Sequence, residues 1–204
     1  MKTLLLAGFF SVGGGGYYLL ILVFMVLLVG LYIWGSSRKR KDETGGATEE
    51  YAYLTEETLA ALPDDKLVKA VAANLIAKLD DRHPDAYAVI PQLSRGRCVV
   101  YSVWLICHEL DEAGFEELFA SPSGEFTELA AGAMEELGAS RCGEALRKSM
   151  GAGPEELSDL HADFLEAVEE EKPLDRCTAY IRDNPSEFID SPDDDPNQFK
   201  TITL

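Results

Sequence analysis

Apolar residues recur every three or four positions along most of the chain after residue 63. This period is that of an α-helix with one buried face, and no stretch alternates between apolar and polar residues as a half-buried strand does. The pattern predicts helices from Pro63-Asp64-Asp65 to about Leu79, from Ser94 to Glu112, from Ser123 to Leu137, from Ser140 to Met150, from Leu157 to Val168 and at Asp175–Arg182, with a short turn at Phe115 to Phe119. We therefore expect an all-α fold.

Apolar stripes on these helices identify the expected core. The stripes are Val100, Val103, Trp104, Cys107 and Leu110; Cys142, Ala145, Leu146 and Met150; and Leu157, Leu160, Phe164, Leu165 and Val168. Gly114, Gly138 and Pro173 stand where helices are expected to end, and Ser140 is a candidate N-cap. The helices should pack into one compact domain.

The segment from Tyr17 to Trp34 is apolar on all sides, and no charged residue occurs from Thr3 to Ser37. Its 18 residues, at about 1.5 Å each, reach roughly 27 Å, close to the hydrocarbon thickness of a bilayer. Aromatic residues at both ends suit the level of the lipid headgroups. The segment predicts one transmembrane helix at about 17–34. The competing interpretation is a cleaved signal peptide, because Lys2 precedes a short apolar run.

Four basic residues at 38–41 follow the predicted span. The positive-inside tendency then places the large C-terminal part in the cytoplasm. We expect a membrane anchor at 1–37, a basic stop and flexible linker at 38–50, an all-α cytoplasmic domain at 51–190 and a disordered acidic tail at 191–204. The predicted location is the cell membrane, which the chain crosses once.

The charge of the chain is strongly acidic, with 36 Asp and Glu against 18 Lys and Arg, a net charge of −18 and a pI near 4.4. Direct binding to nucleic acid would need a basic face, so this balance argues against it. The carboxylates either keep a solvated surface soluble or form an anionic surface that attracts a basic protein. Composition alone favours the first interpretation.

Residues that could carry chemistry are few. His108 and Glu112 are four apart on one helix face, but HELDE lacks the second histidine of the HExxH zinc motif. The chain has four cysteines, at 98, 107, 142 and 177, and no two of them have CxxC spacing. This spacing favours free thiols over disulfides or a metal site. No nucleophile-elbow or phosphate-loop motif occurs. We expect no enzyme activity, no metal and no cofactor.

Carboxylates crowd the end of the predicted helix at 94–112 and the corner that follows it. We expect these side chains to contact a partner: Glu109, Asp111, Glu112, Glu116 and Glu117.

The stretch from Val99 to Phe188 resembles the DMP-type DNA-mimic protein family. The likeness rests on VVYSVWLICHEL leading into DEAGFEELFASPSGEF, on AMEELGA at 133–139 and on YIRDNP at 180–185 with Phe188. Members usually carry two asparagines at the first corner, where this chain has Asp111 and Glu112, while Gly114 and Phe115 are kept. The resemblance implies an acidic all-helical fold, a backbone turn at Gly114 and an aromatic anchor at Phe115. It also implies a surface whose carboxylates imitate DNA phosphates.

These observations predict a membrane-anchored, non-enzymatic interaction module with an acidic surface. Its partner would be a basic protein, and a DNA mimic that binds a DNA-binding protein is the more specific version. An alternative is an immunity-like or regulatory protein that neutralises a basic toxin or nuclease. The sequence does not predict the oligomeric state.

Overall fold

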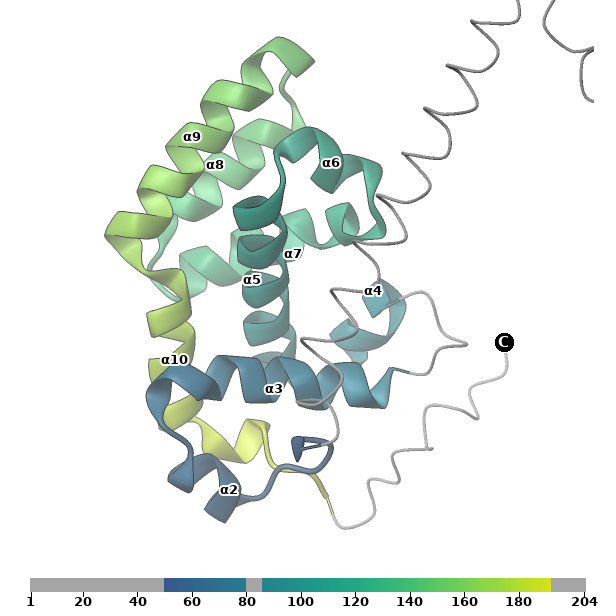
Figure 1. Cartoon of the computed structure of the whole chain (residues 1–204), viewed down its shortest axis with the longest axis vertical. Helices are drawn as coiled ribbons and strands as arrows, with labels where there is room; N and C mark the ends of the chain where they lie inside the picture. The colour runs from purple at the N-terminus through teal and green to yellow at the C-terminus, as the bar shows by residue number, and fades with distance from the viewer. Residues whose placement is uncertain (1–49, 80–85, 192–204) are drawn as a thin grey trace, which may run out of the picture. The chain divides into compact units, whose positions relative to one another are not determined.

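The computed structural model describes residues 50–79 and 86–191, and helices make up most of this part of the chain (Figure 1). The helices are α2 (Glu56–Ala61), α3 (Asp64–Lys78), α4 (Ala86–Val89), η1 (Ile90–Gln92), α5 (Arg95–Glu112), α6 (Phe115–Ala120), η2 (Pro122–Phe126), α7 (Thr127–Glu136), α8 (Ser140–Met150), α9 (Pro154–Glu171), α10 (Pro173–Asp183) and η3 (Pro185–Glu187). These residues contain no β-strand, so the all-α prediction is confirmed.

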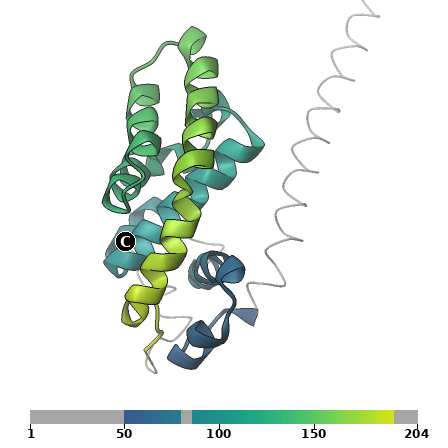
Figure 2. The same ribbon diagram turned by 90° about the vertical axis from the view of Figure 1, so that its left-hand side faces the viewer.

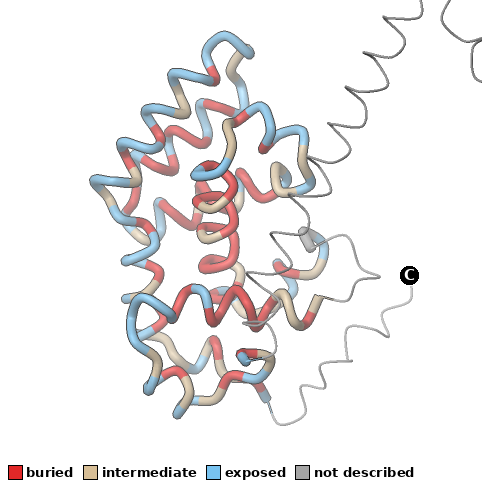
Figure 3. Tube along the Cα trace, in the orientation of Figure 1, coloured by how far each residue is buried: buried red, intermediate tan, exposed pale blue. Residues whose placement is uncertain are grey.

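Helix α5 runs through the middle of the domain and is buried along most of its length (Figures 1 and 3). It packs against α3, α7 and α10, with further contacts to α6 and α9. Val100, Val103 and Leu110 are fully buried, as the apolar stripe predicts. Ser94 caps the helix, because its hydroxyl accepts a hydrogen bond from the backbone N–H of Arg97. The other helices surround this core.

Helices α7 and α8 form a tightly packed pair. Gly138, which follows the end of α7, has φ of +82°, a conformation that glycine adopts at little cost. A Cβ on Gly143 would lie 2.7 Å from the Ala131 carbonyl oxygen, so the two backbones approach closely because this residue is glycine. The predicted helix end at Gly138 is confirmed.

The predicted start of α7 at Ser123 is wrong by four residues, because η2 fills Pro122–Phe126 and α7 begins at Thr127. The predicted N-cap at Ser140 is also wrong. Ser140 is the first helical residue of α8, and its side chain does not cap the helix. Instead, the carboxylate of Glu171 accepts hydrogen bonds from the backbone N–H groups of Arg141 (3.1 Å) and Cys142 (2.9 Å). A side chain from the end of α9 therefore supplies the cap.

Helices α9 and α10 follow each other almost end to end (Figure 2). They meet at Lys172, the one non-glycine residue with positive φ (50°) among the described positions. Pro173 ends α9, as predicted, and also begins α10, because proline fits the first position of a helix, where its missing N–H is not needed. The last helix is therefore longer than the predicted Asp175–Arg182 segment.

Two large apolar residues assigned to the core are exposed. Met150 lies at the end of α8 with 43% exposure, and Leu165 on α9 has 38%. Both predictions are wrong, because the stripes are wider than the faces that α8 and α9 bury against each other and against the core. Leu157, Phe164 and Ala167 supply the buried face of α9.

The two ends of the domain are joined by Asp190, whose side chain is buried. Its carboxylate accepts hydrogen bonds from the Leu54 N–H (2.8 Å), Asn74 Nδ2 (2.8 Å), Arg97 Nη2 (2.5 Å) and Lys78 Nζ. We call this set, with its acceptor and four donors, the Asp190 cluster. It ties the last described residues to the segment before α2, to α3 and to α5.

The predicted transmembrane helix at 17–34 lies outside the described residues, as do the remainder of the predicted anchor and nearly all of the linker and tail. Within residues 50–79 and 86–191, no helix is both long enough and apolar enough to span a bilayer.

Candidate acidic interaction site

The end of α5 and the start of α6 place four of the five predicted contact residues at the surface. Asp111, Glu112, Glu116 and Glu117 are exposed, and we call them the acidic corner. Glu109 is different, because it is only 8% exposed and its carboxylate accepts a hydrogen bond from the Ser123 hydroxyl at 3.2 Å. Glu109 therefore holds η2 against α5 and is not part of an exposed contact surface.

Phe115 anchors the acidic corner from below, as the family resemblance implies. Its ring is buried and lies 5.9 Å from the His161 ring and 6.1 Å from the Phe164 ring, both on α9. His161 Nε2 also donates a hydrogen bond to the Leu110 carbonyl oxygen at 2.7 Å. Gly114 is the N-cap residue before α6 and has φ of −90°, so the turn does not depend on a conformation that only glycine reaches easily. These contacts fix the corner on a rigid support.

The Lys and Arg side chains of the described residues form their ion pairs outside the acidic corner. Most described Lys and Arg side chains pair with carboxylates: Arg95 with Glu136, Arg141 with Glu170, Arg147 with Glu128 and Glu135, Lys148 with Glu144, Lys172 with Glu169, Arg182 with Asp64, and Lys78 and Arg97 with Asp190. Helix α9 contains no Lys or Arg. Within the described ranges, no Lys or Arg pairs with a carboxylate of the acidic corner. The ion-pair contact that the corner does make joins Glu112 Oε1 to His108 Nε2 at 3.9 Å, and it is an ion pair only when the histidine is protonated.

A groove of about 780 Å³ lies beside the acidic corner, between α3, α5, α9 and α10. Figure 2 faces the side of the domain on which α9 and α10 follow each other, with α3 beside them. Asp111 belongs both to the corner and to the groove lining. Trp104 and His108 lie one turn apart on α5 and stack with ring centroids 5.6 Å apart. The groove thus extends the acidic corner along one face of α5.

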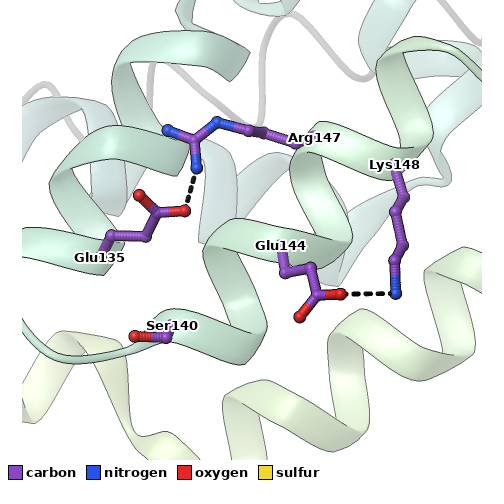
Figure 4. A pocket seen from close by; sticks show the side chains of 5 residues that line it. All are labelled: Glu135, Ser140, Glu144, Arg147 and Lys148. Carbon is purple, nitrogen blue, oxygen red and sulfur yellow. Dashed lines mark hydrogen bonds and ion pairs between the residues drawn. The ribbon is translucent and has the colours of Figure 1, made fainter.

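A second hollow is lined by Glu135, Ser140, Glu144, Arg147 and Lys148 (Figure 4). Its charged groups already pair across it, Arg147 with Glu135 and Glu144 with Lys148 at 2.8 Å. This hollow therefore offers a partner little uncompensated charge, and the groove is the better candidate site.

Histidine, cysteine and carboxylate side chains are the groups that could bind a metal, and a cysteine thiol could also act as a nucleophile. The described residues contain no group of three or more His, Cys, Asp and Glu side chains that could hold a metal ion. The four cysteines are free. Burial raises the pKa of the Cys177 thiol to about 12, and burial together with Glu171 raises the pKa of Cys142 to about 12. These two thiols stay protonated at neutral pH, which makes them weak nucleophiles.

Sequence reasoning missed the Asp190 cluster and the groove. Asp190 precedes an acidic run at 193–195, so nothing in the local pattern separates it from solvated acids. The groove combines residues from four helices, and only the surplus apolar positions of α9 and α10, such as Leu165 and Leu174, could have signalled it.

Together, these features define a small, acidic, all-helical domain with uncompensated carboxylates beside a groove. The chain belongs to the DMP19-like protein family, whose family model matches residues 91–198, and this match confirms the family resemblance. No curated protein and no solved structure matches the chain.

Proposed function

We propose that the chain is a membrane-anchored, non-enzymatic interaction module whose acidic surface binds a basic protein. The observation that carries this proposal is the unequal distribution of charge. Lys and Arg pair with carboxylates over most of the domain, while the four carboxylates of the acidic corner are exposed without a Lys or Arg partner among the described residues. These four carboxylates lie close together at the end of α5 and the start of α6, so they concentrate negative charge that a basic partner can contact.

Uncompensated carboxylates on a rigid support suit recognition of a basic surface. They steer the approach of a cationic partner and fix its orientation, and the resulting affinity falls with added salt. Phe115 and His161 hold the α5–α6 corner in one geometry, so little conformational entropy is lost on binding.

A DNA-binding protein is the specific kind of partner that we favour. Membership of the DMP19-like family and the resemblance to DNA-mimic proteins support it. In this version, the exposed carboxylates take the place of DNA phosphates on the basic surface of the partner. The apolar segment at 17–34 and the basic residues at 38–41 support the membrane anchor, which would keep the bound partner at the cytoplasmic face.

Charge reversal at the acidic corner tests the proposal. We expect the full chain to capture basic proteins from an extract of cells that encode it, and both salt and duplex DNA to displace them. The triple variant Glu112→Lys, Glu116→Lys and Glu117→Lys should lose this capture without unfolding. The matched control reverses three exposed carboxylates on other elements: Glu125, Glu166 and Asp183.

The readout is mass spectrometry of the bound proteins, with circular dichroism at 222 nm as the check on folding. Equal loss of capture in both triple variants would show that net charge matters and the corner does not. Capture that the corner variant leaves unchanged would contradict the proposal. One tight stoichiometric partner that DNA does not displace would favour the immunity-like alternative over DNA mimicry.

A further inference from the structure

The groove between α3, α5, α9 and α10 has apolar walls that a purely electrostatic surface does not need. Leu165 on α9 and Leu174 on α10 line it and are 38% and 37% exposed. Trp104 and Val168 are partly buried in the same lining, over a floor that includes Phe164. Apolar side chains gathered in a hollow mark a binding surface more often than scattered ones do.

Charged groups around these apolar walls are mostly negative. Asp64, Asp65, Asp111 and Asp175 line the groove, against Lys69 and Arg182. The guanidinium of Arg182 is already held by Asp64 at 2.7 Å and by the Leu59 carbonyl oxygen at 2.6 Å. A ligand that enters the groove therefore meets apolar side chains in the middle and an excess of carboxylates at the rim.

We infer that the groove binds a segment of the partner in which bulky apolar side chains are flanked by lysine or arginine. The inference rests on the proposed function, which requires a basic partner, and adds that recognition includes an apolar anchor. Leucine-sized side chains would contact Leu165, Leu174 and Trp104, while the flanking cations would approach Asp65, Asp111 and Asp175. A basic protein without such an apolar segment could not make this contact. The contact would therefore distinguish the partner from other basic proteins.

Charge complementarity and apolar burial favour this occupant over a simple polycation. Burying a leucine side chain stabilises a complex more than a single exposed ion pair does. A simple polycation would form the exposed ion pairs but would bury no apolar side chain. A purely apolar segment would leave the rim carboxylates desolvated beside it, which costs free energy.

The test uses two acetylated and amidated hexapeptides of equal charge. One has two central leucines between two pairs of lysines, and the other has two central serines in the same frame. The chain has two tryptophans, so Trp34→Phe leaves Trp104 as a fluorescent reporter in the groove lining. The full chain in uncharged detergent micelles is titrated with each peptide. A parallel titration of micelles without protein measures how much of each peptide partitions into the detergent.

We expect the leucine peptide to bind about tenfold more tightly than the serine peptide, equivalent to about 1.4 kcal/mol, and to change Trp104 emission. Replacing Leu165 and Leu174 by serine should remove this difference without weakening the serine peptide. Met150→Ser removes an apolar side chain of similar exposure outside the groove lining and should change neither affinity.

A second variant, Ala179→Arg, places a cation in the groove from an exposed position of α10 and should also abolish the preference for leucine. This variant keeps the inference testable if the variant with serine at positions 165 and 174 fails to fold. Equal affinity of the two peptides, or a preference for leucine that survives Ala179→Arg, would overturn the inference while leaving an acidic surface that binds cations. If neither peptide bound, the inference and the proposed function would both lose their support.

Discussion

The Asp190 cluster and the acidic corner use carboxylates in opposite ways. In the cluster, one buried carboxylate accepts hydrogen bonds from Lys78, Arg97, Asn74 and the Leu54 N–H. In the corner, four exposed carboxylates have no Lys or Arg partner within the described residues. A buried charge must be paired because its desolvation is costly, whereas an exposed one is solvated by water and needs no partner to be stable.

This difference separates a structural role from a binding role. Removing a carboxylate from the cluster should change folding stability strongly, because it leaves two buried cations without their counter-charge. Removing one from the corner should change stability little and binding strongly. The comparison can therefore be tested by measuring both quantities on variants of each region.

The largest expected effect on stability is that of Asp190→Asn. The substitution keeps the shape of the side chain but removes the charge that Lys78 and Arg97 share. Breaking a buried ion pair in this way costs about 3–5 kcal/mol, so the midpoint of urea unfolding should fall sharply. Tryptophan fluorescence and circular dichroism would follow the transition.

Asp183→Asn is the matched control, since Asp183 is an exposed carboxylate at the end of α10. Its stability should stay within about 0.5 kcal/mol of the unchanged chain. Similar losses for Asp183→Asn and Asp190→Asn would contradict the contrast between buried and exposed carboxylates.

Acid should remove the contribution of Asp190. Burial alone would raise the pKa of this carboxyl, but the hydrogen bonds from Lys78, the Leu54 N–H and Asn74, with the charge of Arg97, lower it below the ordinary value of 3.8. The charged form is therefore favoured by folding, and its contribution is complete above that ordinary value. It is lost as the pH falls from about 4 towards the lowered pKa.

The measurement is urea unfolding of the unchanged chain and of Asp190→Asn between pH 7 and pH 3. The difference in unfolding free energy should be constant down to about pH 5 and should shrink below about pH 4. A difference that stayed constant to pH 3, or that shrank already at pH 6, would assign the stabilisation to another group.

Local sequence patterns predicted the helices well because each helix buries a periodic apolar face. Val100, Val103 and Leu110 were assigned correctly from spacing alone. The errors lie where tertiary contacts replace local ones. The sequence predicts Ser140 as an N-cap, but Glu171, at the distant end of α9, accepts hydrogen bonds from the N–H groups at the start of α8 instead. Leu165 fitted the stripe of α9, but it lines the groove.

The acidic corner could be located from the sequence because its residues are neighbours in the chain. Glu109 could not be separated from them, since its burial depends on contacts such as that with Ser123 from η2. Asp190 illustrates the same limit, because its four donors come from residues 54, 74, 78 and 97. The chemistry of a carboxylate depends on its partners, and long-range partners leave no local pattern.

A smaller effect should separate two neighbouring carboxylates at the end of α9. Burial acts to raise the pKa of Glu171, but the hydrogen bonds that it accepts from the Cys142 and Arg141 N–H groups at the start of α8 lower this pKa below its ordinary value. Glu170 forms an exposed ion pair with Arg141. We expect Glu171→Gln to lower the free energy of unfolding by about 0.5–1 kcal/mol, because the negative charge at the N-terminus of α8 is lost. The effect is no larger because water screens this partly exposed carboxylate. Glu170→Gln should lie within the error of urea unfolding at physiological salt. Equal effects would show that net charge near Arg141 matters and that the cap does not.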